Sequence, residues 1–502
     1  MEKPNTNMEI SRLLEYGLQR GLIAPEDKAY AANRMLALLG LREFEPQPVE
    51  EELHTPVEPL ERLCQFAAEA GLIEPDTRDG RDQFDTELMN CLMPRPSQVV
   101  GEFYSLYEKD KQAATDYYYQ LARSSNYIRV DRIEKDRMWT APTPYGDLVI
   151  TINLSKPEKD PKAIAAAKNA PQSGYPKCAL CRENEGYLGS ANQAARGNHR
   201  LIPLELGGEP WFLQYSPYVY YNEHCIVLSH EHRPMKVSRQ SISRLLEFVT
   251  FLPHYFVGSN ADLPIVGGSI LTHDHFQGGR YEFPMAKAPI REKVCFPGFE
   301  DVEAGIVHWP MSVIRLRGKE AQRLVDLADK ILTAWREYSD ESAEILAYTE
   351  GTPHNTITPI ARRRGEDYEL DLVLRNNRTT PEHPLGLFHP HAEYHHIKKE
   401  NIGLIEVMGL AILPPRLLTE TGLLEQALKD PAQAQEIMAR PEMEKHQAWY
   451  EELKAAGAGE GDTQRAIQVS IGVIFGKILG NAGVYKDTEE GREAFRRFCS
   501  SL

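Results

Sequence analysis

The apolar positions of the first hundred residues predict two similar helical hairpins. Each copy begins with an amphipathic helical segment that a glycine ends, and a proline follows within a few residues. The first copy spans residues 10–14 and 21–25, and the second spans residues 60–64 and 71–75. A repeated hairpin of this kind is typical of a packing or interaction module, and we find no catalytic constellation in it.

The middle of the chain predicts a mixture of helices and strands. Periodic apolar residues predict helices over residues 104–121 and 238–251, and Ser238 is suited to cap the second of them. Apolar and β-branched runs predict strands at residues 148–152, 211–215, 224–229 and 270–277. The charged, alanine-rich residues 156–172 predict either a loop with a short helix or a surface excursion.

A second series of the same elements follows. Residues 307–316 predict a strand, residues 320–338 a helix, and residues 368–375 a strand whose alternating apolar and polar residues indicate one buried face. Beyond residue 415 the chain predicts helices. The sequence therefore predicts an α+β fold with an internal duplication, divided into residues 1–98, 99–300, 301–418 and 419–502.

The net charge of −16 over 502 residues argues against a surface for nucleic acid or anionic membranes, because both favour basic patches. The N-terminal residues predict no signal peptide, and the longest apolar run, residues 402–415, is too short to span a bilayer. The chain has seven cysteines, which are few for its length and cannot all be paired. This number fits free thiols in a reducing cytoplasm. The basic run at residues 362–364 predicts a solvated loop or a phosphate contact.

The main candidate for chemistry is the glycine-flanked stretch of residues 267–279, which contains His273, His275 and Gln277. On a strand these three side chains would point the same way, and the glycines would let the backbone approach a phosphate. An imidazole in this setting can attack phosphorus and carry a covalent intermediate. The alternative is a pair of histidines that only form hydrogen bonds inside the fold.

Cys178 and Cys181 form a C-x-x-C pair. This spacing occurs in zinc sites, in redox pairs and by coincidence. A redox pair would begin a helix after a parallel strand, whereas residues 174–176 predict a turn. A zinc site would need two further ligands from distant parts of the chain.

A second H-x-H pair, His389 and His391, follows in the second series of elements. Glu393 occupies the position that corresponds to Gln277, and two more histidines follow closely. A neutral amide suits a nucleophile that meets an anionic substrate. The histidine-rich second stretch is more typical of a metal or structural site.

Taken together, these motifs resemble those of the galactose-1-phosphate uridylyltransferases of the histidine-triad superfamily. The resemblance includes the cysteine pair, both H-x-H pairs, Ser-His-Glu-His at residues 229–232, and residues 389–416, which look like the bacterial second type. It covers residues 142–416 for the chemistry and, with the N-terminal helical extension, most of the chain. The family implies duplicated histidine-triad-like units of antiparallel sheet and helices, with helical extensions and the active site in the first half.

The resemblance implies a double displacement. His275 would attack the α-phosphorus of UDP-glucose, glucose 1-phosphate would leave, and galactose 1-phosphate would then take the uridylyl group. Gln277 would donate to phosphoryl oxygens without adding negative charge. Asn260 and Ser269 are candidates for nucleotide or phosphate contacts, with ordinary loop roles as the alternative.

The resemblance also implies metal. A closed, structural zinc site would have four ligands, namely Cys178, Cys181, His232 and His273. The alternative is a branch that has lost the metal and in which these residues merely pack together. Some relatives carry a second metal, for which the candidate ligands are His354, His389 and His391, with Glu282 or Glu292 as possible carboxylates.

The sequence departs from the family's first type at Asp274 and Phe276, and at residues 412–415, where that type has a glutamine in its sugar-binding stretch. Two alternatives stay open: a dinucleoside-polyphosphate hydrolase or phosphorylase of the same superfamily, and a non-enzymatic zinc-stabilised binding protein. The expected partners are UDP-glucose and galactose 1-phosphate, without nucleic acid or membrane. A homodimer is compatible with the sequence.

Overall fold

The computed structural model describes residues 5–154, 174–190 and 193–502, which divide into two compact units. The first unit comprises the described residues within Met1–Lys135, Ser155–Val219 and Glu223–Arg233. The second comprises Asp136–Leu154, Tyr220–Asn222 and Pro234–Leu502. The prediction for residues 156–172 lies outside the described residues, and the four boundaries predicted along the sequence stay a prediction.

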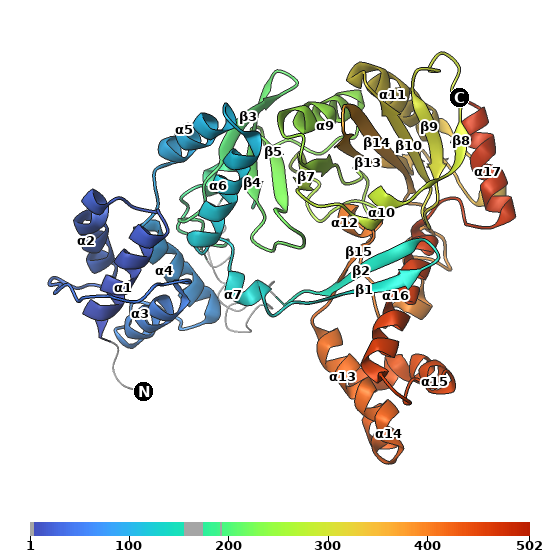
Figure 1. Ribbon diagram of the computed structural model, residues 1–502. Helices are drawn as coiled ribbons and strands as arrows, with labels where there is room; N and C mark the ends of the chain where they lie inside the picture. Colours follow the sequence, from blue (N-terminus) through green and yellow to red (C-terminus); the bar gives the residue numbers. More distant parts are fainter. Residues whose placement is uncertain (1–4, 155–173, 191–192) are drawn as a thin grey trace. The chain divides into compact units, whose positions relative to one another are not determined.

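Helices make up the N-terminal part of the first unit, coloured from blue to cyan in Figure 1. They are α1 (Thr6–Gln19), α2 (Lys28–Leu38), α3 (Val57–Glu69), α4 (Arg78–Asn90), α5 (Pro96–Tyr107), α6 (Lys111–Ser124) and α7 (Val130–Ile133). Gly21 and Gly71, two residues beyond the ends of α1 and α3, have φ angles of 66° and 71°. Glycine adopts this left-handed conformation readily, so it ends both helices as the repeat predicted.

The predicted helix over residues 104–121 is interrupted. The side chain of Asp110 accepts a hydrogen bond from Gln112 N at 2.8 Å and so caps the start of a new helix. The segment therefore forms the end of α5 and most of α6.

The strands β3 (Ile202–Leu206), β4 (Glu209–Tyr215) and β5 (Cys225–Ser229) form an antiparallel sheet in the first unit. The predicted strands at residues 211–215 and 224–229 correspond to β4 and β5. The Tyr118 hydroxyl, on α6, donates to Arg200 O at 2.5 Å and to Leu213 O at 3.2 Å. These bonds hold α6 against the sheet.

A larger antiparallel sheet lies in the second unit, in the order β7-β6-β13-β14-β10-β9-β8. Its strands are β6 (Phe256–Gly258), β7 (His275–Gly279), β8 (Ile290–Val294), β9 (Glu303–Val307), β10 (Val313–Gly318), β13 (Asn355–Arg364) and β14 (Asp367–Asn376). The helices α9 (Arg239–Phe251) and α11 (Ala321–Glu337) pack against each other and against β13 (Figure 1). The short strands β11 (Tyr348–Thr349) and β12 (Thr352–Pro353) pair separately.

A smaller sheet of the second unit contains β1 (Arg137–Thr143), β2 (Gly146–Ile152) and β15 (Leu410–Leu413), with β15 parallel to β2. The helix α16 (Thr463–Ala482) approaches β1 so closely that a Cβ atom on Gly472 would lie 2.1 Å from Ala141 Cβ. Glycine is therefore required at this contact. The other helices of this unit are α10 (Pro284–Lys287), α12 (Leu404–Val407), α13 (Arg416–Lys429), α14 (Pro431–Met438), α15 (Gln447–Ala455) and α17 (Glu489–Ser500).

Of two strand predictions in the second unit, one is wrong and the other is correct except for its expected exposed face. Residues 307–316 form the end of β9 and the start of β10, separated by a bend at Pro310, which has no N–H for a sheet hydrogen bond. Residues 368–375 do form β14, but nearly all of its side chains on both faces are buried. Asp371 and Arg375, which the alternation placed at the surface, are 0% and 1% exposed.

The basic run at residues 362–364 belongs to β13 instead of a solvated loop. Arg362 is buried, and its Nε donates to Glu369 Oε1 at 2.6 Å. Arg362 therefore forms an ion pair within the sheet, whereas Arg363 Nη2 donates to Glu366 O at 2.7 Å and Arg364 pairs with Glu282 as well as Glu369.

The arrangement of helices and antiparallel sheets confirms the predicted α+β class. The predicted helices over residues 238–251 and 320–338 are α9 and α11, and Ser238 caps α9 by accepting from Ser241 N at 3.3 Å. In the described part of the chain, we find no helix with the length and apolar character needed to cross a membrane.

Candidate functional site

The two cysteines of the C-x-x-C pair lie in a tight turn of the first unit. Cys181 N donates to Cys178 O at 3.2 Å, and Asn184 Nδ2 donates to the carbonyl oxygens of both cysteines at 2.8 Å. The two Sγ atoms are 3.6 Å apart, whereas a disulfide bond would bring them to about 2.05 Å. Within the described residues 174–190, Cys181 is followed by the short 3-10 helix Arg182–Asn184, whereas a thioredoxin-like redox pair would begin an α-helix.

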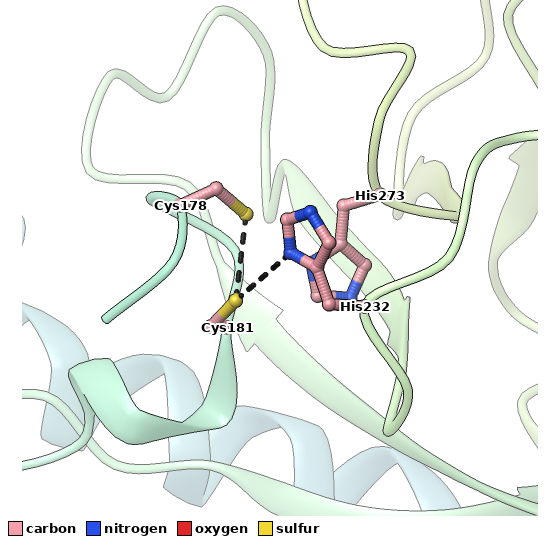
Figure 2. Close-up of side chains that lie close together, drawn as sticks. All are labelled: Cys178, Cys181, His232 and His273. Atoms are coloured by element: carbon pink, nitrogen blue, oxygen red, sulfur yellow. Dashed lines mark hydrogen bonds between the residues drawn. The ribbon is translucent and has the colours of Figure 1, made fainter. Parts of the chain in front are cut away.

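His232, which follows β5, supplies a third potential metal ligand. Its Nδ1 lies 3.2 Å from Cys181 Sγ (Figure 2). His273 is the fourth member of the group, and one ligand atom from each of the four side chains lies within 4.8 Å of the others.

This donor set fits zinc. A tetrahedral zinc ion with ligand distances of about 2.0–2.3 Å would hold its ligand atoms roughly 3.3–3.8 Å apart. Two separations within the group, 3.6 Å between the two sulfurs and 3.2 Å between Cys181 Sγ and His232 Nδ1, are close to these values. Two thiols and two imidazoles are a common ligand set for a closed structural zinc site.

The H-x-H-x-Q stretch is only partly a strand. β7 begins at His275, and residues 270–274 precede it. Leu271 O accepts from Met235 N at 2.9 Å, so the backbone here forms hydrogen bonds outside the sheet. The prediction that His273 shares a strand face with His275 and Gln277 is therefore wrong, although His275 and Gln277 do share one.

The surroundings of His275 favour a neutral imidazole. The residue is buried, and burial lowers its pKa to about 4, against the opposing effect of a hydrogen bond between Nδ1 and His273 O at 2.8 Å. Because a carbonyl oxygen only accepts, Nδ1 must carry the proton and Nε2 keeps its lone pair. An uncharged imidazole with an available lone pair can act as a nucleophile at pH 7.

The two candidate contact residues differ in their surroundings. Asn260 is buried, and its Oδ1 accepts from Leu404 N at 2.9 Å. A Cβ atom on Gly268 would lie 2.8 Å from Asn260 Nδ2, so the glycine allows the motif to approach this amide. Ser269 is exposed.

The predicted second metal site does not form in the described part of the chain, where the four-residue group above is the one that could hold a metal ion. The three histidines are committed to different partners. His354 Nδ1 lies 2.8 Å from Asn377 Oδ1, His389 Nε2 lies 3.1 Å from Asn401 Oδ1, and His391 Nε2 lies 3.1 Å from Leu387 O. The candidate carboxylates Glu282 and Glu292 bind Arg364 and Arg496.

The second unit also contains a buried ionic network that the sequence pattern does not predict. Asp371 accepts hydrogen bonds from Arg315 Nε and Arg362 Nη2, both at 2.6 Å, and none of the three side chains is more than 9% exposed. Arg315 also donates to Ala288 O and Met285 O at the end of α10. Periodicity cannot reveal such a network, because its members come from separate strands.

Comparison with known proteins defines the class of enzyme. Two family models match in sequence order: the N-terminal domain of galactose-1-phosphate uridyl transferase over residues 21–234, and its C-terminal domain over residues 247–448. Together they cover most of the chain. The matches define a nucleotidyltransferase.

Relatives of similar length match along the whole chain. A galactose-1-phosphate uridylyltransferase from Clostridium acetobutylicum is 52% identical over 99% of this chain and 100% of its own, and one from Halalkalibacterium halodurans is 53% identical over the full length of both. The chain belongs to the galactose-1-phosphate uridylyltransferase family. Among solved structures, yeast Ap4A phosphorylase Apa2 in complex with Ap4A is 12% identical over 65% of this chain and 92% of its own, with a TM-score of 0.34.

Proposed function

We propose that this nucleotidyltransferase transfers the uridylyl group of UDP-glucose to galactose 1-phosphate through a covalent intermediate on His275. The main support for this reaction is that the chain is 52–53% identical to galactose-1-phosphate uridylyltransferases over their full length. The hydrogen-bonded, neutral imidazole of His275 supports its role as the nucleophile.

The proposed reaction has two balanced steps. In the first, Nε2 of His275 forms a bond to the α-phosphorus of UDP-glucose, the bond from that phosphorus to the bridging oxygen breaks, and glucose 1-phosphate leaves. In the second, a phosphate oxygen of galactose 1-phosphate attacks the same phosphorus, the P–N bond breaks, and UDP-galactose forms. One imidazole thus serves both steps and is neutral again at the end.

The fixed position of the ring is important for this chemistry. The hydrogen bond from Nδ1 to His273 O sets both the ring orientation and the tautomer, so that Nε2 points its lone pair at the reacting phosphorus. Gln277, on the same face of β7, would donate its amide hydrogens to phosphoryl oxygens that gain charge in the transition state. Asn260 and Ser269 are proposed as further contacts to the nucleotide or its phosphates.

Zinc is proposed as a structural ion held by Cys178, Cys181, His232 and His273. When bound, it would fix the backbone of residue 273, whose carbonyl oxygen orients the His275 ring. It would take no part in bond making. The cytoplasmic location and a homodimer remain predictions from the sequence.

The test of the proposed function is to trap the intermediate. We expect incubation with UDP-glucose alone to add one uridylyl group per chain, which peptide mass spectrometry should locate on His275. Addition of galactose 1-phosphate should remove it and yield UDP-galactose. His275→Asn should abolish both labelling and turnover, whereas His54→Ala, which changes a side chain that is 77% exposed, should leave both unchanged.

The outcomes separate the alternatives. Labelling at another residue would contradict the assignment of His275. Labelling followed only by hydrolysis to UMP would favour a hydrolase, and failure of UDP-glucose to bind or react would favour a non-enzymatic binding protein.

A further inference from the structure

Arg375, on β14, is a fully buried cation. Its Nη2 donates to Ile402 O at 2.8 Å and its Nη1 to Thr358 Oγ1 at 3.3 Å, while its Nε has no hydrogen-bond partner in the part of the chain that the structure describes. Burial lowers its pKa to about 10, so the guanidinium still carries its charge at pH 7. A buried donor without a partner and a charge without its own counter-ion are both unfavourable.

The carboxylate that acts on Arg375 over some distance is Glu406. Glu406 Oε1, however, lies 3.1 Å from Lys398 Nζ, and its Oε2 accepts from Gly403 N at 3.1 Å. Lys398 also lies 3.8 Å from Glu400 Oε2, but Glu400 is 59% exposed and its charge is screened by water. Glu406 is therefore shared between Lys398, which it contacts directly, and the more distant Arg375, which has no carboxylate of its own among the described residues. Arg375 differs in this respect from Arg315 and Arg362, which share Asp371 at direct hydrogen-bond distance.

Arg375 lies on the same face of the sheet as His275 and Gln277. The strand registers connect Gln277 to Gly258, Gly258 to Ile360, and Ile360 to Asp371. Directly paired residues point to the same face, as do residues two apart on one strand. Arg375 therefore shares the face of Asp371, Gln277 and His275.

The guanidinium reaches toward His275 across this face. Its contact with Thr358 places it over β13, and β6 lies between β13 and β7. Since neighbouring strands are about 4.8 Å apart, the charge lies roughly 10 Å from the strand that carries His275. At that separation an unpaired charge still acts on a phosphate in a poorly solvated site.

Arg375 also holds a segment next to Asn260. Its bond to Ile402 O fixes one end of residues 402–404, and the bond from Leu404 N to Asn260 Oδ1 fixes the other. A change at position 375 thus has two separable consequences: loss of charge and loosening of this segment.

We propose that Arg375 supplies the uncompensated positive charge that attracts the phosphate groups of the nucleotide sugar to the His275 face, without touching the substrate. It is a positioning residue. The inference rests on the proposed function, because it takes the phosphates to lie beside His275. It predicts that the effect of removing the charge depends on the charge of the ligand.

The test compares the binding of ligands of different charge to Arg375→Met and Arg375→Lys. With an effective dielectric constant of about 20, a unit charge roughly 10 Å away changes affinity by about tenfold for each ligand charge. Arg375→Met should therefore weaken UDP-glucose binding by tenfold or more and leave uridine binding within about twofold. Arg375→Lys keeps the charge but not the hydrogen bonds, and it should retain UDP-glucose affinity within about threefold. Isothermal titration calorimetry at low salt would give these values.

Arg317→Met is the matched control, because Arg317 lies on the same sheet face but is 43% exposed and paired with Asp367 at 2.8 Å. We expect it to bind both ligands like the unchanged protein. Equal weakening of uridine and UDP-glucose by Arg375→Met, or equal losses in Arg375→Met and Arg375→Lys, would overturn the inference and leave a purely structural role. Unaltered UDP-glucose binding by Arg375→Met with intact labelling of His275 would overturn the inference alone, whereas failure of the unchanged protein to bind UDP-glucose would overturn the proposed function as well.

Discussion

Asp371→Asn offers a quantitative test of the buried ionic network. The substitution keeps the shape of the side chain and removes a charge that is 0% exposed and shared by two arginines. Removal of one partner from a buried ion pair costs about 3–5 kcal/mol, because the remaining charge stays desolvated. Glu369, which lies 2.6 Å from Arg362 and 3.9 Å from Arg315, still compensates part of the positive charge, so we expect the lower end, about 3 kcal/mol.

Differential scanning calorimetry of the full chain would measure this loss. For a unit of this size, 3 kcal/mol corresponds to a fall in the unfolding midpoint of roughly 5–10 °C. The matched control is Asp367→Asn, in a neighbouring pair with Arg317 whose side chains are 24% and 43% exposed. An exposed pair contributes about 0–1 kcal/mol, so its midpoint should fall by no more than roughly 3 °C. Similar shifts for the two variants would refute the argument that burial sets the strength of this network.

Three further predictions concern the metal group, the nucleotide side of the site and the response to acid. Purified protein should contain about one zinc ion per chain, measured by elemental mass spectrometry. Cys181→Ala should lose the zinc, whereas the control Cys295→Ala, which changes an exposed cysteine, should keep it. A zinc content below about half an equivalent in the unchanged protein would contradict the four-ligand site. Gly268→Ala should displace Asn260 and raise the KM for UDP-glucose several-fold. The control is Gly101→Ala, whose new Cβ atom would meet nothing within 4 Å and should leave KM unchanged. The same KM in Gly268→Ala and the unchanged protein would show that Asn260 is not part of the site. Burial lowers the pKa of His199 from 6.5 to about 3. As the pH falls, the unfolded chain therefore binds a proton at this histidine before the folded chain does. The contribution of neutral His199 to the free energy of unfolding is complete above pH 6.5 and is lost as the pH drops toward 3. His199→Asn should reduce the slope of the unfolding midpoint against pH in this window, and an unchanged slope would show that His199 does not contribute.

The sequence predicted those parts of the site whose information is local. Cys178 and Cys181 are three residues apart, and the short turn that joins them fixes their separation almost regardless of the rest of the fold. The glycine stops at Gly21 and Gly71 likewise depend on one residue each. His232 and His273 could be added to the metal group only through the family resemblance, since spacing alone does not bring distant ligands together.

The parts that the sequence could not predict depend on partners elsewhere in the chain. The alternation along residues 368–375 was a correct sign of a strand and a wrong sign of an exposed face. Asp371 is buried because Arg315, 56 residues away, and Arg362, nine residues away, both bind it. The alternation of residues along a strand shows which side chains are polar, but it does not show whether a charged side chain forms an ion pair inside the protein.

This distinction matters for the face that carries His275. A polar sheet face can be buried only if its charges are paired, and most of the charges on this face are paired on the side of β10 and β14. Arg375 is an exception, because no carboxylate of the described residues contacts its guanidinium, which extends over β13, toward β7. Paired charges hold the sheet together without producing a strong field, whereas an unpaired one attracts an anion. The division of one face into a compensated part and an uncompensated part would therefore let the same layer of side chains stabilise the fold at one end and receive phosphate at the other.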